Sequence, residues 1–266
     1  HGRALTWIAR LLGRRAVIFM PRGAVPSRID AIKSEGAEVI VVEGGYDDAV
    51  GRASEEAEKK GLVVVADVGY PGYMEIPRYI QKGYMTIFRE TTRQLAERGE
   101  KTPDIVFVQA GVGAFASAAA LYFNDPADGI RLFSVEPEDA DCLFRSAEAG
   151  DGKAHSSPAF ENTIMVGLNC ETPSMAAWPI VRDRFEGYST IEDHYAEEAM
   201  RLLAGEGIVS GESGAAGLGA LIALLNEEPS FAEEKLKLKN DASVLVINTE
   251  ADTDPEGYRK IVGQTL

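Results

Sequence analysis

The residues best suited to chemistry form a glycine-rich turn, Gly111-Val112-Gly113-Ala114, which follows an apolar run and opens a stretch of small residues. Backbone N–H groups at the start of a helix point at whatever lies in front of it. Glycine lets a ligand approach without meeting a Cβ atom. An anionic group, above all a phosphate, is therefore the ligand that this 111–114 turn would bind. A tight strand-to-helix turn without a ligand is the structural alternative.

Two kinds of phosphate ligand compete for this turn. Read as G-x-G-x-x-A, Gly111, Gly113 and Ala116 match a dinucleotide fingerprint, with Glu136 as the partner of a ribose hydroxyl. That fingerprint normally opens the first βα unit of its domain, whereas three apolar runs precede it here. Glu136 is also followed by Pro137 and an acidic run, which more simply indicates a solvated helix start.

The first quarter of the chain alternates short apolar runs with stretches of helical spacing. Almost continuous apolar runs are typical of strands buried on both faces of a parallel sheet. The expected strands are 15–20, 37–42 and 62–67, and helices are expected between them. This βαβαβ pattern predicts a small α/β lobe over residues 1–75.

A second series predicts a large α/β lobe over residues 76–266, beginning with a long helix at 76–99. Further strands are expected at 104–109, 131–136, 163–168 and 243–249, and helices near 114–123, 139–148, 192–204 and 213–226. Asp67 ends a predicted strand, where a carboxylate would face the ligand crevice of an α/β protein. A turn-capping aspartate is the alternative.

Composition excludes several classes of protein. The 266 residues carry a formal net charge of −15 without a basic stripe, which argues against nucleic-acid binding. No apolar run reaches the length of about 18 residues that predicts a membrane span. Cys142 and Cys170 are too few for a disulfide scaffold, so a cytoplasmic location is expected. His155 and His194 lack partner patterns, and no metal-ligand spacing is present.

Several segments together resemble the diaminopropionate ammonia-lyase family. This family belongs to the fold-type-II enzymes that use pyridoxal 5′-phosphate (PLP), which are similar to the tryptophan synthase β chain. The opening HGR and the MP after a strand are shared by many of these enzymes. More specific to the ammonia-lyases is the combination of DADC (139–142), SGESGA (210–215) and TEADTD (249–254).

The resemblance implies an α/β fold of two lobes, with parallel sheets flanked by helices and PLP in the cleft between them. It implies α,β-elimination of 2,3-diaminopropionate, a small amino acid, to pyruvate and ammonia, and a homodimer. A serine or threonine dehydratase is a near alternative. A dinucleotide-dependent oxidoreductase and a non-catalytic PLP-binding homologue represent other classes.

Carried over by motif, the backbone of the 111–114 turn would hold the PLP phosphate, and Thr249 would hydrogen-bond the pyridine nitrogen. Glu212 and Ser213, which open a predicted helix, would line the edge of the cofactor ring, although a plain helix cap is equally simple. Asp67 would contact the substrate's amino groups or act as an acid/base partner.

The resemblance places the family's Schiff-base lysine in a stretch that would precede His1. Because a PLP lyase needs this lysine, the 266 residues alone are expected to be inactive or nearly so, with apolar surface left uncovered. Lys33, Lys59 and Lys60 lie in charged helical stretches, and nothing around Lys82 marks it as a replacement. Cys142 and Cys170 fall in segments that match family motifs, so a disulfide beside the cleft is a hypothesis.

Overall fold

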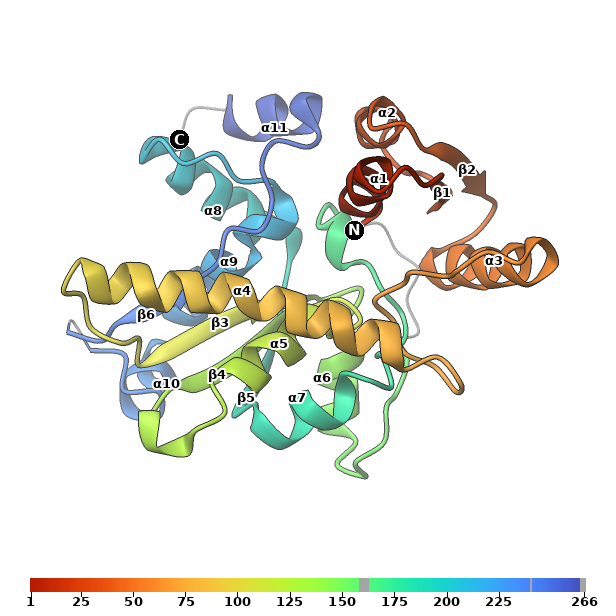
Figure 1. Ribbon diagram of the computed structural model, residues 1–266. Helices are drawn as coiled ribbons and strands as arrows, with labels where there is room; N and C mark the ends of the chain where they lie inside the picture. Colours follow the sequence, from red (N-terminus) through yellow and green to blue (C-terminus); the bar gives the residue numbers. More distant parts are fainter. Residues whose placement is uncertain (158–162, 240, 264–266) are drawn as a thin grey trace.

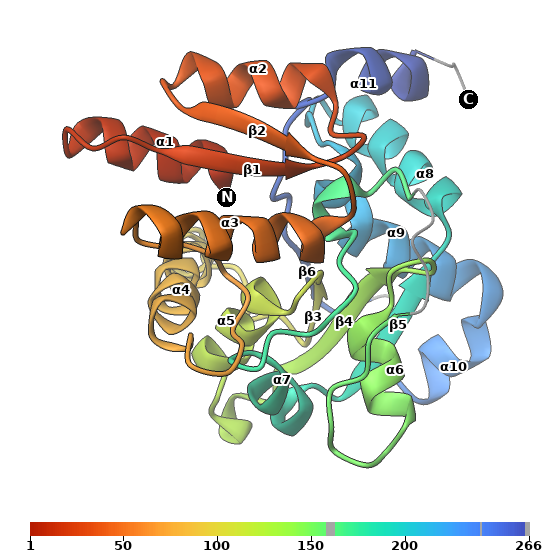
Figure 2. The same cartoon turned by 90° about the vertical axis from the view of Figure 1, so that its right-hand side faces the viewer.

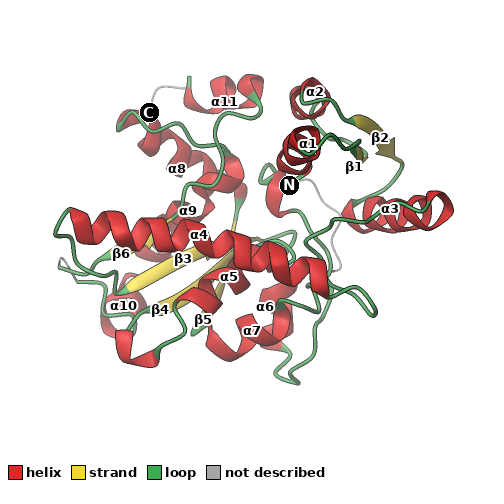
Figure 3. Ribbon diagram, viewed as in Figure 1, coloured by secondary structure: helices red, strands yellow, loops and turns green. Residues whose placement is uncertain are grey.

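The computed structural model describes residues 1–157, 163–239 and 241–263, and it has two separate parallel sheets. Figure 1 shows that the elements before residue 61 form a group at the upper right, apart from most of the other elements. Helices flank the sheets in both parts (Figure 3). The predicted α/β class with parallel sheets flanked by helices is confirmed.

The first sheet has two strands, which pair in parallel from Val17 opposite Glu38 to Pro21 opposite Val42. Proline at the first position of α2 and a left-handed glycine after α3 fix the ends of these helices. The elements, seen together in Figure 2, are α1 (Gly2–Leu11), β1 (Val17–Pro21), α2 (Pro26–Ser34), β2 (Glu38–Val42) and α3 (Tyr46–Lys60).

The prediction of a third strand at 62–67 is wrong, because this run joins no ladder in the described chain. Side chains bind its backbone instead. The Tyr73 hydroxyl accepts from the Ala66 N–H at 2.9 Å and donates to the Val64 carbonyl at 3.0 Å. A ring nitrogen of His1 lies 2.8 Å from the Val65 carbonyl. The apolar run therefore forms no strand, and two of its residues, Leu62 and Val63, are exposed.

The second sheet has four parallel strands in the order β5-β4-β3-β6. Its strands are β3 (Ile105–Gln109), β4 (Arg131–Pro137), β5 (Gly187–Ile191) and β6 (Val244–Val246). The described helices around it are α4 (Glu75–Glu97), α5 (Ala114–Tyr122), α6 (Cys142–Glu148), α7 (Trp178–Arg184), α8 (Asp193–Gly205), α9 (Glu212–Glu227), α10 (Pro229–Glu234) and α11 (Pro255–Val262), with short 3-10 turns η1 (Pro126–Asp128) and η2 (Val166–Leu168).

Alternate residues of β3 enter two different apolar cores, as the pleat of a strand requires. Val106 and Val108 pack with side chains of α4, α5 and α7, whereas Ile105 and Phe107 pack with α8 and α9. Every residue of β3 is buried. This strand therefore lies in the interior of the large sheet. Its carboxyl end, which leads into the 111–114 turn, is fixed by packing on both faces.

One further prediction is wrong, and one strand of the structure was not predicted. The strand expected at 163–168 is wrong, because its last three residues form the 3-10 turn η2. The sequence analysis also missed β5, whose residues GYSTI are mostly polar or small. Gly187 is needed there because a Cβ atom would lie 2.5 Å from the ring of Phe133 on β4. Close packing between strands, rather than hydrophobicity, selects this residue.

The long helix expected at 76–99 is confirmed as α4, and the four helices expected after it correspond to α5, α6, α8 and α9. The division of the chain at residue 75 stays a prediction, although the two sheets lie on either side of that residue. Among the described residues, no helix is both long and apolar enough to cross a bilayer.

Candidate active site

A cleft of about 2920 Å³ lies between the two sheets. Side chains of β1, α2 and α3 line one wall, and the carboxyl end of β3 and the loop after β6 line the other. Ligands of open α/β proteins bind outside the carboxyl ends of parallel strands. The structure brings together most of the predicted site residues in this cleft: Asp67, Gly111, Val112, Gly113, Ala114, Ser213 and Thr249.

The 111–114 turn forms a cradle at the start of α5. The backbone N–H groups of Gly111, Gly113 and Ala114 donate to no other group in the described chain. A Cβ atom on Gly111 would lie 2.9 Å from the Cys170 sulfur, and Gly113 has a left-handed φ of +90°. Free N–H groups at a helix N-terminus that only glycine can shape fit a phosphate group.

Thr249 follows β6 and lies on the wall of the cleft that faces the small sheet. Its side chain is exposed to the cleft. Its hydroxyl oxygen accepts a hydrogen bond of 2.8 Å from the Nε2 atom of Gln109, the last residue of β3. The same nitrogen donates to the Ile247 carbonyl at 2.7 Å. Sequence analysis did not select Gln109, whose position at the end of the strand, two residues before the glycine turn, was the available signal.

Asp67 is half-buried and lines the cleft beside Tyr46. The Tyr46 hydroxyl donates to a carboxylate oxygen of Asp67 at 2.9 Å. Burial, followed by the nearby Asp67 charge, raises the pKa of Tyr46 well above its usual value. Tyr46 therefore stays neutral as a hydrogen-bond donor and orients the carboxylate.

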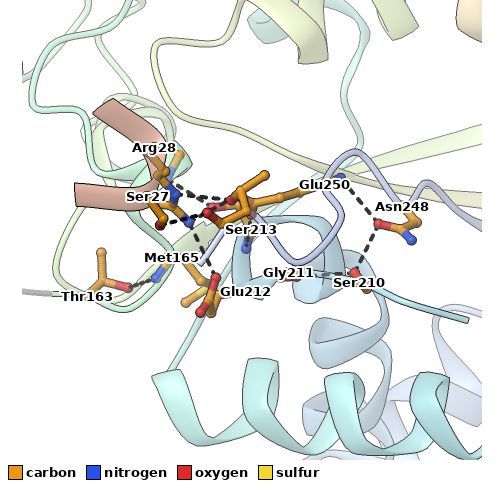
Figure 4. A network of polar contacts seen from close by, with 12 residues as sticks. Ser27, Arg28, Thr163, Met165, Ser210, Gly211, Glu212, Ser213, Asn248 and Glu250 are labelled. Carbon is orange, nitrogen blue, oxygen red and sulfur yellow. Dashed lines mark hydrogen bonds and ion pairs between the residues drawn. The ribbon is translucent and has the colours of Figure 1, made fainter. Parts of the chain in front are cut away.

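The two residues that open α9 point in different directions, as Figure 4 shows. The Ser213 hydroxyl accepts from the Gly167 N–H at 2.9 Å, and Ser213 lines the cleft. Glu212 instead faces Arg28 of α2, with 3.4 Å between Nη2 and its carboxylate. Burial raises the pKa of Glu212. The role of Glu212 at the cofactor ring stays a prediction. In the structure, its carboxylate forms an ion pair with Arg28 across the cleft.

A polar cluster that the sequence did not reveal joins the two sides of the cleft (Figure 4). Arg28 Nη2 donates to Glu250 at 2.9 Å, and Arg28 Nε donates to the Thr253 hydroxyl at 3.1 Å. The neighbouring Ser27 hydroxyl donates to the Thr253 carbonyl at 3.0 Å. More than 220 residues separate these partners, so no local spacing indicated their contact.

Glu136 cannot serve a ribose hydroxyl as the dinucleotide alternative requires. Its carboxyl group is fully buried and accepts hydrogen bonds from the N–H groups of Leu143 at 2.8 Å and Phe144 at 2.7 Å. Burial raises the pKa of Glu136 to about 8 despite these two donors. Because this carboxyl group lies in the protein interior, it is not available to a ribose hydroxyl. The dinucleotide interpretation therefore keeps only the glycine turn as support.

The disulfide hypothesis is wrong for this structure, in which Cys142 and Cys170 are both free and buried. The Cys142 thiol donates to the Gly111 carbonyl at 3.6 Å. Burial raises the pKa of both thiols. The two cysteines pack around the back of the 111–114 turn as protonated, apolar side chains.

Among the described lysines, Lys60 is the one that lines the cleft, and it is paired with Glu56 one helical turn away on α3. Lys82 lies over the ring of Tyr79 on α4, at 5.9 Å from the ring centre. That no described lysine replaces the family's Schiff-base lysine stays a prediction.

Comparison with known proteins identifies the family. The family model described as "Pyridoxal-phosphate dependent enzyme" matches residues 1–250. The chain is 40% identical to the diaminopropionate ammonia-lyase of Salmonella typhimurium over 275 aligned positions, and 42% identical to that of Escherichia coli K12 over 270. Each alignment covers 98% of this chain and 67% of the relative.

Solved structures agree with this assignment. The holo diaminopropionate ammonia-lyase of Escherichia coli superposes with a TM-score of 0.90 at 40% identity, over 98% of this chain and 67% of that one. The same enzyme with an aminoacrylate–PLP azomethine intermediate also gives 0.90 at 40% identity, over 98% and 68%. The matched family model and these relatives show that the chain belongs to the pyridoxal-phosphate-dependent enzyme family, with diaminopropionate ammonia-lyases among its relatives.

Proposed function

We propose that this chain forms the PLP-binding part of an ammonia-lyase that converts 2,3-diaminopropionate and water to pyruvate and two molecules of ammonia. The observation that carries the proposal is the 42% identity to the Escherichia coli enzyme over 98% of this chain. The cradle at residues 111–114 supports it, because the free N–H groups there suit the phosphate of the cofactor.

The remaining predicted site residues have assigned roles in this proposal. When bound, PLP supplies an electron sink for the substrate carbon that bears the α-amino group. The hydroxyl of Thr249 would meet the pyridine nitrogen, and Ser213 and Glu212 would support the ring edge. Asp67, oriented by Tyr46 at 2.9 Å, binds an amino group of the substrate or exchanges a proton with it.

We further propose a homodimer in the cytoplasm. The dimer rests on the family resemblance alone. The cytoplasmic location is supported by two cysteines that are buried and unpaired, because secreted proteins commonly use cysteines in disulfides.

The first test is pyruvate formation from 2,3-diaminopropionate by the purified chain with added PLP. Methylamine at high concentration would stand in for the amine of a Schiff-base lysine. We expect pyruvate that requires both PLP and substrate and that increases with methylamine. PLP binding without any pyruvate under these conditions would favour a non-catalytic homologue, and no PLP binding would refute the proposal.

A threonine dehydratase is the second candidate, favoured by 28% identity to the Pasteurella multocida enzyme over 56% of this chain. L-Threonine would then yield 2-oxobutyrate. The same assay separates the candidates, because the proposal predicts faster turnover of 2,3-diaminopropionate than of L-threonine.

A further inference from the structure

The side chain of Gln109 is buried at the base of the cleft and binds two groups beyond β6. Gln109 itself is 2% exposed. Its Nε2 atom donates to the Ile247 carbonyl at 2.7 Å and to the Thr249 hydroxyl oxygen at 2.8 Å. Its Oε1 atom is also buried and has no partner in the described part of the chain.

The chemistry of Ile247 decides which way round the Gln109 amide lies. A backbone carbonyl can only accept, so the amide nitrogen, and not the amide oxygen, must face it. Rotating the amide by half a turn would bring two oxygens together in a buried place, which is unfavourable because neither oxygen can donate a hydrogen bond. The same nitrogen contacts Thr249, whose oxygen must therefore accept the second hydrogen bond.

This contact restricts the hydroxyl proton of Thr249. Besides its bond to carbon, the hydroxyl oxygen has three directions, one for the proton and two for lone pairs. Gln109 occupies one lone-pair direction. No acceptor for the proton is recorded in the described chain, and Thr249 is open to the cleft. Leaving a donor unpaired is less common in proteins than leaving a lone pair unused, so the proton is directed at a ligand.

We propose that Gln109 is a positioning residue that makes the Thr249 hydroxyl a donor toward the pyridine nitrogen of PLP and thereby keeps that nitrogen unprotonated. The inference rests on the proposed function, because it takes Thr249 as the contact of the ring nitrogen. An unprotonated ring withdraws electrons less strongly than a pyridinium ring. This favours prompt loss of a β-substituent over a long-lived carbanion.

The test is the ¹⁵N NMR signal of PLP labelled at the ring nitrogen and bound to the intact chain. We expect a pyridine signal in the unaltered chain. Gln109→Glu places an acceptor beside Thr249, which would take the hydroxyl proton and move the signal to the pyridinium region. Gln109→Met frees the Ile247 carbonyl to accept that proton and should shift the signal in the same direction.

Two further variants serve as controls. Gln81→Met removes another buried glutamine, on α4 and outside the cleft lining, and should leave the signal unchanged. Thr249→Asp places a carboxylate at the ring nitrogen and should give a pyridinium signal whatever Gln109 does. The dissociation constant of PLP should change by about tenfold or less in the Gln109 variants, because they alter one hydrogen bond.

The outcomes separate the inference from the proposed function. A pyridinium signal in the unaltered chain, or a pyridine signal in both Gln109 variants, would overturn the inference and leave PLP binding intact. No bound PLP, or no response to Thr249→Asp, would remove the proposed cofactor site and with it the inference.

Discussion

The two sheets that form the cleft differ in how completely they are buried. Every residue of β3 is buried, and β4 is buried at all positions but its first. In β1 a single residue is buried and in β2 none is. The groups proposed to hold the cofactor, the 111–114 turn and Gln109, lie at the end of the fully buried strand. Rigid packing and precise ligand positioning therefore coincide in the large sheet.

The small sheet contributes in a different way. It lines the cleft with every residue of β1 and with side chains of the helices beside it, such as Arg28 on α2. Large apolar side chains remain exposed on this side of the molecule: Trp7, Ile8, Leu11, Leu12, Val41, Leu62 and Val63. The comparison predicts that mutations will affect stability unequally on the two sides of the cleft.

The largest effect is expected from a core substitution in the large lobe. Phe88 is fully buried and stacks on Phe115 at 5.1 Å between ring centres. Phe88→Ala should lower the free energy of unfolding by about 3–5 kcal/mol because it leaves a cavity. The matched change Val41→Ala, at a residue 50% exposed on β2, should cost about 0.5 kcal/mol or less. Urea denaturation measures both, and equal losses would contradict the comparison.

The next effect concerns the ion pairs that join the two sides. Arg28→Ala removes the cation that faces Glu212 and Glu250, which are mostly buried. We expect a loss of about 3 kcal/mol, because two carboxylates remain without a partner. Arg52→Ala on α3 breaks its pairs with Glu55, which is exposed, and with Glu56, which keeps Lys60 as a partner, and should cost less than about 1 kcal/mol. Similar losses in both variants would show that the Arg28 cluster does not stabilise the contact across the cleft.

Glu136 should make the free energy of unfolding depend on pH. Its pKa of about 8 in the folded chain lies above the ordinary value of 4.5. Between these two pH values, the folded state therefore keeps a proton on Glu136 that the unfolded state has lost. Stability should therefore fall by up to about 1.4 kcal/mol per pH unit as pH rises from roughly 4.5 to 8, then level off. Glu136→Gln should flatten this slope in denaturation measured between pH 5 and 8. An unchanged slope would assign the dependence to other groups.

The smallest effect on stability is expected from alanine substitutions at two glycines, which distinguish backbone strain from loss of ligand binding. Gly113 and Gly61 both have left-handed φ values, +90° and +63°, so alanine at either place should cost about 1–2 kcal/mol. Only Gly113 lies in the proposed phosphate cradle. Gly113→Ala should therefore weaken PLP binding strongly in a fluorescence titration, whereas Gly61→Ala should leave it unchanged. Equal affinities would show that the cradle does not hold the phosphate.

Much of the fold could be predicted from local sequence. Continuous apolar runs predicted β1, β2, β3 and β4, because strands buried in parallel sheets need apolar residues on both faces. The same criterion failed at 62–67, where side chains of Tyr73 and His1 take the place of a neighbouring strand. It also failed at β5, where close approach to Phe133 requires glycine.

The sequence by itself determined the glycine turn after β3 and the family to which the chain belongs, because both depend on the order of residues along the chain. Only the tertiary structure decided that Gln109 meets Thr249, that Arg28 meets Glu250, and that Glu136 is enclosed away from the cleft. Hydrogen bonds between residues more than 100 positions apart leave no local pattern. Burial of a carboxyl group likewise depends on the elements that pack around it.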